Sequence, residues 1–113
     1  MSSVVIYHNP KCSKSRRALA ILQDSGVSFE IIEYLKTPPD AATLRAILAK
    51  LNLPPKELVR SKEHQTLGLP LAVDEDELID QLVAHPEILQ RPIVVVGNKA
   101  KIGRPPEQIL AIL

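Results

Sequence analysis

The sequence predicts an α/β fold with a four-stranded mixed sheet and a helical insertion between the second and third strands. Three patterns lead to this prediction. A strand, a helix and a second strand follow one another within residues 4–34, and a hairpin pattern lies near the C-terminus. Between them, residues 37–90 carry mainly helical periodicity. Strands that alternate with helices are typical of the α/β class.

The first half of the sheet is predicted from the N-terminal residues. Residues 4–7 form a short apolar run rich in β-branched side chains, which meets a polar loop at residues 8–10. From about Lys14 the apolar residues recur at helical spacing, and Gly26 is a stop signal for that helix. Residues 29–34 have the composition of a second strand. A strand-helix-strand unit of this length implies a right-handed crossover between parallel strands.

The insertion contains several helical segments. It opens with two prolines that suit a first helical turn, flanked by two candidate caps, Thr37 and Asp40. A second proline pair starts a shorter helix over residues 54–59. Residues 62–73 have little periodicity and are predicted to form a loop. A further helix follows within residues 74–86, with acidic side chains at its positive end and a His-Pro pair that ends it.

The C-terminal part completes the sheet. Residues 93–96 and 99–102 are strand-like segments joined by a Gly-Asn turn, which predicts an antiparallel hairpin. A last helix is predicted over residues 105–113. Without the insertion, strand-helix-strand followed by strand-strand-helix is the order of the thioredoxin fold. We therefore expect one thioredoxin-like domain over residues 1–113.

Composition and charge exclude several classes of function. The chain of 113 residues is 45% hydrophobic and 24% charged, with a formal net charge of +1, so it has no overall bias toward nucleic acid or anionic lipid. Its apolar stretches are far shorter than a membrane span, and its first residues lack the features of a secretory signal. We expect a cytoplasmic protein with no nucleic-acid or membrane partner. His64 and His85 have no ligand-like spacing to each other or to the lone cysteine, so we interpret them as surface or helix-end residues and predict no metal site.

The single cysteine, Cys12, lies where a strand gives way to a helix. Free backbone N–H groups and the helix dipole favour negative charge at such a position. No carboxylate occurs from residue 7 to residue 22, and the basic neighbours of the sulfur are Lys11, Lys14, Arg16 and Arg17. We interpret Cys12 as a reactive thiol with a lowered pKa. The alternative is a small buried residue beside a solvated basic helix face.

The loop around this cysteine resembles that of a known family. Residues 8–16 read His-Asn-Pro-Lys-Cys-Ser-Lys-Ser-Arg. They resemble the active-site loop of the ArsC-like, glutaredoxin-dependent arsenate reductases, whose pattern is His-Asn-Pro-x-Cys-x-x-Ser-Arg. Five further segments agree with that family in order and spacing, namely residues 34–39, 58–60, 67–69, 91–94 and 103–105. The resemblance covers essentially the whole chain.

The resemblance implies a role for six residues. Cys12 matches the catalytic nucleophile, and His8 and Ser15 match residues that tune the thiol. The residues that match the arsenate-binding arginines are Arg60, Arg91 and Arg104. Guanidinium groups suit the oxygens of a tetrahedral oxyanion, although each arginine read alone would more often be a solvated surface residue.

The resemblance also implies a backbone feature and a source of electrons. Arg91–Pro92 matches a cis peptide bond beside the family's active site, whereas the alternative is an ordinary trans proline at a strand edge. Because the chain has no second cysteine, outside thiols must supply the electrons. We expect glutathione to be the reductant, glutaredoxin to be the partner, arsenate to be the substrate, and no cofactor to be bound.

Two other functions remain open at this point. Relatives with this fold include redox-responsive transcription regulators with a Cys-x-x-Cys switch. Ser15 occupies the fourth position of that motif here, which leaves only a binding role without a disulfide switch. A thiol transferase acting on glutathione mixed disulfides is the other alternative, because a single cysteine suffices for that reaction.

Overall fold

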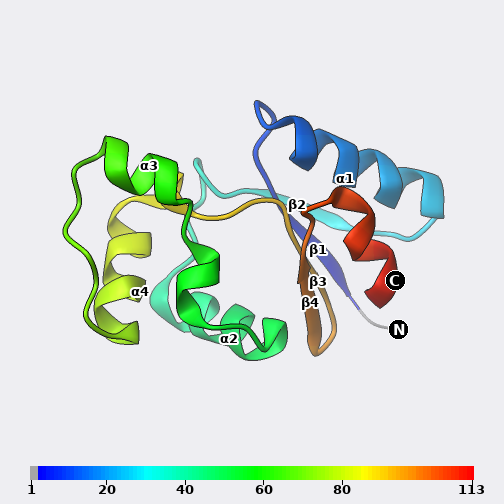
Figure 1. The fold of residues 1–113 in the computed structure, drawn as a ribbon. Helices are drawn as coiled ribbons and strands as arrows, with labels where there is room; N and C mark the ends of the chain where they lie inside the picture. The colour runs from blue at the N-terminus through cyan, green and yellow to red at the C-terminus, as the bar shows by residue number, and fades with distance from the viewer. Residues whose placement is uncertain (1–2) are drawn as a thin grey trace. The chain divides into compact units, whose positions relative to one another are not determined.

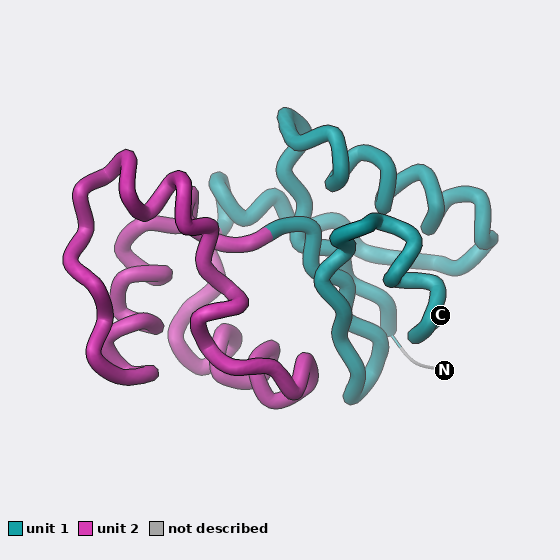
Figure 2. Tube along the Cα trace, in the orientation of Figure 1, with its two compact units in different colours: residues 1–37, 91–113 teal, residues 38–90 magenta. Residues whose placement is uncertain are grey.

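A computed structural model describes residues 3–113 (Figure 1). Two compact units are formed by Met1–Thr37 with Arg91–Leu113 and by Pro38–Gln90 (Figure 2). We call them unit 1 and unit 2. The prediction of a single domain over the whole chain stays a prediction. No helix in the described part of the chain is both long and apolar enough to cross a membrane.

Unit 1 is built on a four-stranded sheet in the order β2-β1-β3-β4. The strands are β1 (Val4–His8), β2 (Glu30–Glu33), β3 (Ile93–Val96) and β4 (Lys99–Ile102). β1 pairs parallel with β2 and antiparallel with β3, which in turn pairs antiparallel with β4. The helices of unit 2 all fall between β2 and β3 in the chain. The predicted α/β class, with a mixed sheet and a helical insertion, is therefore confirmed.

Two helices pack on the sheet of unit 1. They are the α-helix α1 (Ser13–Ser25) and the 3-10 helix η3 (Pro106–Ile112), which contact each other and lie beside the sheet in Figure 1. Ile6 of β1, Leu22 of α1 and Ile109 of η3 have no exposed surface and belong to one apolar cluster. Burial of each such side chain contributes about 1.5–3 kcal/mol. This core holds α1 and η3 against the sheet.

Unit 2 consists of helices. They are α2 (Ala41–Leu51), η1 (Pro55–Leu58), α3 (Ser61–Thr66), α4 (Glu75–Ala84) and η2 (Pro86–Ile88). Asp40 caps α2 by accepting a hydrogen bond from the N–H of Thr43 at 2.8 Å, and Asp74 caps α4 in the same way. Arg45 joins the two helices because its guanidinium contacts the carboxylates of Glu75 and Asp76. At the start of α4, Asp74 therefore serves for capping, and Glu75 and Asp76 serve for ion pairing.

The structure corrects three details of the predicted elements. α3 lies where we predicted a loop, because its six mainly polar residues have no apolar stripe that would reveal a helix. His64, which we interpreted as a surface or helix-end residue, lies in the last turn of α3, but it is only 8% exposed and bonds through Nε2 to Oε1 of Gln81 at 3.0 Å, so it is not a surface residue. The two prolines that we predicted for the first turn of a helix lie before α2 instead. The last helix begins after the first proline of its predicted range, and it has 3-10 geometry.

Gly103 allows the turn after β4 to approach Pro92 closely. Its N–H donates to the carbonyl of Pro92 at 2.8 Å. A Cβ atom built at Gly103 would lie 2.7 Å from Cγ of Pro92 and 3.5 Å from Cγ2 of Ile109. A contact of 2.7 Å is too short for two carbon atoms, so a side chain here must displace the proline ring or the backbone.

We predict that Gly103→Ala lowers the free energy of unfolding by about 1–3 kcal/mol, the usual cost of overpacking. Urea denaturation followed by circular dichroism measures this loss. Gly26→Asn is the control, because Gly26 has a left-handed backbone (φ 77°) that asparagine tolerates, and its Cβ would meet nothing within 4 Å. Parent-like stability of Gly103→Ala would contradict the close approach.

Candidate active site

Cys12 lies at the junction of β1 and α1 and is the N-terminal capping residue of that helix. Its N–H donates to the carbonyl of Asn9 at 3.0 Å, and its carbonyl accepts from the N–H of Arg16 at 3.0 Å. The first bond closes the loop after β1, and the second begins the hydrogen-bond pattern of the helix. The side chain is a free thiol that is partly exposed. The local backbone therefore presents the sulfur at the positive end of a 13-residue helix.

The surroundings of Cys12 favour its thiolate. Burial acts to raise the pKa of the thiol, but hydrogen bonding from the backbone of Ser15, from the side chain of Arg91 and from the backbone of Lys14 outweighs it, so that the pKa lies below its ordinary value. The Cys12 side chain forms no regular capping hydrogen bond with the first turn of α1. The direction agrees with the lowered pKa that we predicted. A partly exposed thiolate is the form of cysteine that reacts as a nucleophile.

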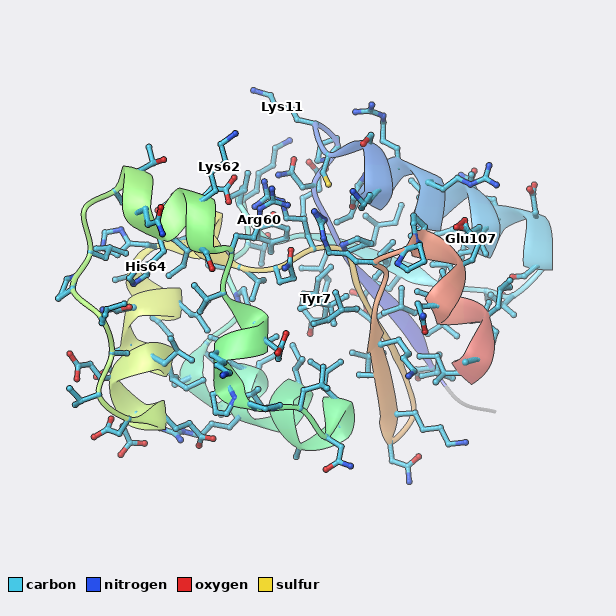
Figure 3. The ribbon with its side chains drawn as sticks, in the orientation of Figure 1. Tyr7, Lys11, Arg60, Lys62, His64 and Glu107 are labelled. Atoms are coloured by element: carbon cyan, nitrogen blue, oxygen red, sulfur yellow. The ribbon has the colours of Figure 1, made fainter. Side chains whose placement is uncertain are left out.

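Three basic side chains close to Cys12 in sequence are directed elsewhere, namely those of Lys11, Arg16 and Arg17. Arg16 donates from Nη1 to the carbonyl of Pro10 at 2.9 Å, and Arg17 lies 3.7 Å from the carboxylate of Glu107. Lys11 is exposed and extends away from the loop (Figure 3). The backbone groups that lower the pKa of the thiol agree with the prediction, whereas the cation that acts on it is Arg91, from a distant part of the sequence, and not one of the sequence neighbours.

His8 and Ser15 are buried together beneath the loop that carries Cys12. Ser15 Oγ accepts from the N–H of Asn9 at 3.0 Å and lies 2.6 Å from Nδ1 of His8. The serine hydroxyl can then donate to Nδ1, which places the imidazole proton on Nε2. Burial lowers the pKa of His8, with the charge of Arg16 acting in the same direction and that of Glu33 against it. A direct effect of these two side chains on the thiol stays a prediction.

Arg91 and Arg104 meet at the entrance to the hairpin. Nη1 of Arg104 donates to the carbonyl of Arg91 at 2.9 Å, while Arg91 acts on the sulfur of Cys12. The peptide bond Arg91–Pro92 is cis, as the resemblance implied. The bond between Arg104 and its following proline is also cis, and nothing in the sequence analysis singled it out. Unit 1 thus brings the thiol and Arg91 together and holds Arg104 against the backbone of Arg91.

Arg60 belongs to unit 2, where it precedes α3 (Figure 3). Its Nε lies 2.7 Å from Oε2 of Glu63, and its side chain is 20% exposed. Its backbone N–H donates to the carbonyl of Ile88 at 2.7 Å. The guanidinium is therefore oriented by a carboxylate within its own unit. Its grouping with the other two arginines stays a prediction.

The site has the groups needed for nucleophilic attack on an anion. A thiolate supplies the nucleophile, and a guanidinium beside it can offset the charge of a bound oxyanion. Among residues 3–113, no three side chains of the His, Cys, Asp and Glu types are grouped so that they could hold a metal ion. What the described groups offer is thiol chemistry on a negatively charged substrate.

Comparison with known proteins gives one consistent result. A family model described as the ArsC family matches residues 7–112. The chain is 50% identical to the uncharacterized protein YfgD of Escherichia coli, over 97% of this chain and 96% of the relative. It is 43% identical to an arsenate reductase of Neisseria meningitidis over the full length of both. A solved structure of an arsenate reductase from Vibrio cholerae is 42% identical and superposes with a TM-score of 0.90, covering 99% of this chain and 98% of the other.

We predict that the alkylation rate of Cys12 by iodoacetamide rises with pH around a midpoint below about 8.5, the value for a free thiol. Arg91→Gln should move this midpoint upward, because it removes the positive charge that acts on the sulfur. Arg17→Gln is the matched control, since Arg17 pairs with Glu107 and should leave the midpoint in place. A parent midpoint at or above about 8.5 would restore the interpretation of Cys12 as an inert residue.

Proposed function

Because the chain belongs to the ArsC family, we propose that it is an arsenate reductase, which converts arsenate to arsenite with Cys12 as its nucleophile. The observation that carries this proposal is the placement of a partly exposed free thiol at the N-terminus of α1, where backbone groups and the Arg91 side chain act to lower its pKa. Such a thiol is more ionised near neutral pH than a free cysteine, and the neighbouring cation suits an anionic substrate. A thiolate without a cation beside it would repel arsenate, which carries one to two negative charges.

The first step is a substitution at arsenic. The Cys12 sulfur forms a bond to arsenic(V), one arsenic–oxygen bond breaks, and the departing oxygen takes up protons and leaves as water. Arsenic keeps its oxidation state in this step. Arg91 and Arg104, joined by Arg60, would bind the remaining oxygens and stabilise the negative charge in the transition state. The contact between Arg91 and the sulfur supports this assignment for one of the three.

The reduction itself needs electrons from outside the chain. Cys12 is its only cysteine, so it cannot form an internal disulfide. A glutathione thiol displaces a second oxygen of the thiol–arsenate adduct, which leaves as water, and arsenic is still As(V). The glutaredoxin thiolate then attacks the glutathione sulfur, so that an S–S bond forms, the S–As bond breaks and its electron pair reduces arsenic to As(III). Water finally replaces the Cys12 sulfur on arsenic, which releases arsenite and restores the thiol. Arsenic gains two electrons over the cycle, and two outside thiols supply them by forming one disulfide.

An omission assay with purified components tests this function. The complete mixture contains the protein, arsenate, glutathione, glutaredoxin and a system that recycles oxidised glutathione, and arsenite is measured directly. We expect arsenite only when all components are present. Formation of arsenite without glutaredoxin would remove the partner from the proposal. Reduction of a glutathione mixed disulfide, with no arsenite formed, would favour the thiol transferase alternative.

We predict that Cys12→Ser abolishes arsenite formation and leaves the fold intact. Serine is nearly isosteric with cysteine, but its hydroxyl is not ionised at neutral pH and cannot replace a thiolate. Thermal unfolding by circular dichroism provides the structural control. Glutathione-dependent turnover by the serine variant would show that another group attacks arsenic.

We also predict that replacing Arg60, Arg91 or Arg104 by alanine weakens transition-state binding by about 2–4 kcal/mol, roughly a thirty- to thousandfold loss in kcat/KM. Lysine should restore only part of this loss, because it keeps the charge but not the planar guanidinium fork. Arg17→Ala is the matched control, since its ion pair with Glu107 is largely exposed. If all three alanine variants melted like the parent and kept the parent kcat/KM, the three-arginine site would be refuted.

A further inference from the structure

Asn9 is the centre of the hydrogen-bond network that shapes the loop before α1. Its side-chain Oδ1 accepts from the N–H of Lys11 at 3.0 Å, and its carbonyl accepts from the N–H of Cys12 at 3.0 Å. Its own N–H donates to Ser15 Oγ at 3.0 Å. These three bonds connect Asn9 to both sides of the loop and to the first turn of the helix. The position of the sulfur therefore depends on where Asn9 is held.

The side-chain amide of Asn9 has a further partner in the residue that follows β2. Its Nδ2 donates to the hydroxyl of Tyr34 at 3.3 Å. The orientation of the amide is defined, because the backbone N–H of Lys11 requires an oxygen on the other side. Tyr34 has no exposed surface and Asn9 is 7% exposed, so water cannot readily replace either group. The Tyr34 hydroxyl is thus a buried acceptor for the Asn9 amide, and the amide would have no ready replacement if this hydroxyl were removed.

The sheet explains why Tyr34 can reach this loop. β1 and β2 run parallel side by side (Figure 1), and their register places His8 opposite Glu33. Asn9 follows His8 and Tyr34 follows Glu33, so both residues leave the sheet at the same end of these two parallel strands. Tyr34 also begins residues 34–39, a segment that the sequence analysis singled out and that the proposed mechanism does not use.

We propose that Tyr34 is a positioning residue for the active thiol: its buried hydroxyl fixes the side chain of Asn9, and Asn9 fixes the loop that presents Cys12 to Arg91 and to the start of α1. The proposal deepens the proposed function, since it concerns the same nucleophile. Tyr34 itself touches neither the sulfur nor the substrate in this account. Its effect passes through the backbone geometry of residues 9–12.

The test removes the hydroxyl and leaves the aromatic ring. In Tyr34→Phe, we expect the alkylation rate of Cys12 by iodoacetamide at pH 7 to fall roughly threefold to tenfold, about the factor that one net hydrogen bond represents. The limiting rate at high pH should be unchanged, because the thiolate itself stays accessible. The charged groups that act on the thiol and on His8 remain in place, namely Arg91, Arg16 and Glu33.

Ser25→Ala is the matched control. It removes a hydroxyl that donates to the carbonyl of Leu22 at 2.7 Å, at the opposite end of α1 from Cys12. We expect Cys12 of this variant to be alkylated at the parent rate, even if its melting temperature falls by as much as that of Tyr34→Phe. A purely structural contribution of Tyr34 would lower stability without changing the pH profile of alkylation.

A double-mutant cycle shows whether Tyr34 acts through Asn9. Asn9→Ala removes the same hydrogen bond from the other side and should also slow alkylation at pH 7. Tyr34→Phe should then have no further effect in the Asn9→Ala background. A parent-like rate in Tyr34→Phe, or a full additional loss in the double variant, would overturn the proposal. Alkylation requires neither arsenate nor glutathione, so this outcome is independent of whether arsenite is formed.

Discussion

A single cysteine can act as a nucleophile near neutral pH only where its surroundings stabilise its charge, and the architecture of unit 1 meets this requirement. Partial burial opposes ionisation of Cys12, so hydrogen bonding must overcome that cost. The backbone groups come from the first turn of α1, and the cation comes from Arg91. These groups can act on the sulfur only if the end of β1, the start of α1 and the residues before β3 are held in fixed positions relative to one another. The apolar cluster shared by these elements is therefore a condition for the reactivity of the thiol.

The order of the strands explains how residues so distant in sequence meet. β1 is central in the sheet, with β2 parallel on one side and β3 antiparallel on the other. The loop after β1 consequently lies next to residues that follow β2 and residues that precede β3. Tyr34 enters from the first neighbour and Arg91 from the second. Arg91 precedes β3 and Arg104 follows β4, so the antiparallel hairpin brings them together, and the side chain of Arg104 donates a hydrogen bond to the backbone of Arg91.

The sequence predicted most of the fold because its signals are local. The hairpin depends on two strand-like runs around a Gly-Asn turn, and the end of α1 depends on a glycine with a left-handed backbone. α3 was missed because its residues are mainly polar and are held by contacts such as that of His64 with Gln81, which have no periodic signature. The same limit applies to the site. The charges next to Cys12 in the sequence were visible, whereas the contact with Arg91 depends on the tertiary fold.

Position 15 shows how the loop is committed to chemistry with one cysteine. In a Cys-x-x-Cys motif this position would carry the second thiol, but here Ser15 is fully buried and its hydroxyl is already engaged. It accepts from the N–H of Asn9 and can donate to the ring of His8, two roles for which a thiol is a weaker substitute. The backbone N–H of the same residue acts on Cys12. A residue that supports the loop and the nucleophile in this way is part of the thiolate's environment, and replacing it by a second thiol would disturb the contacts that hold the loop.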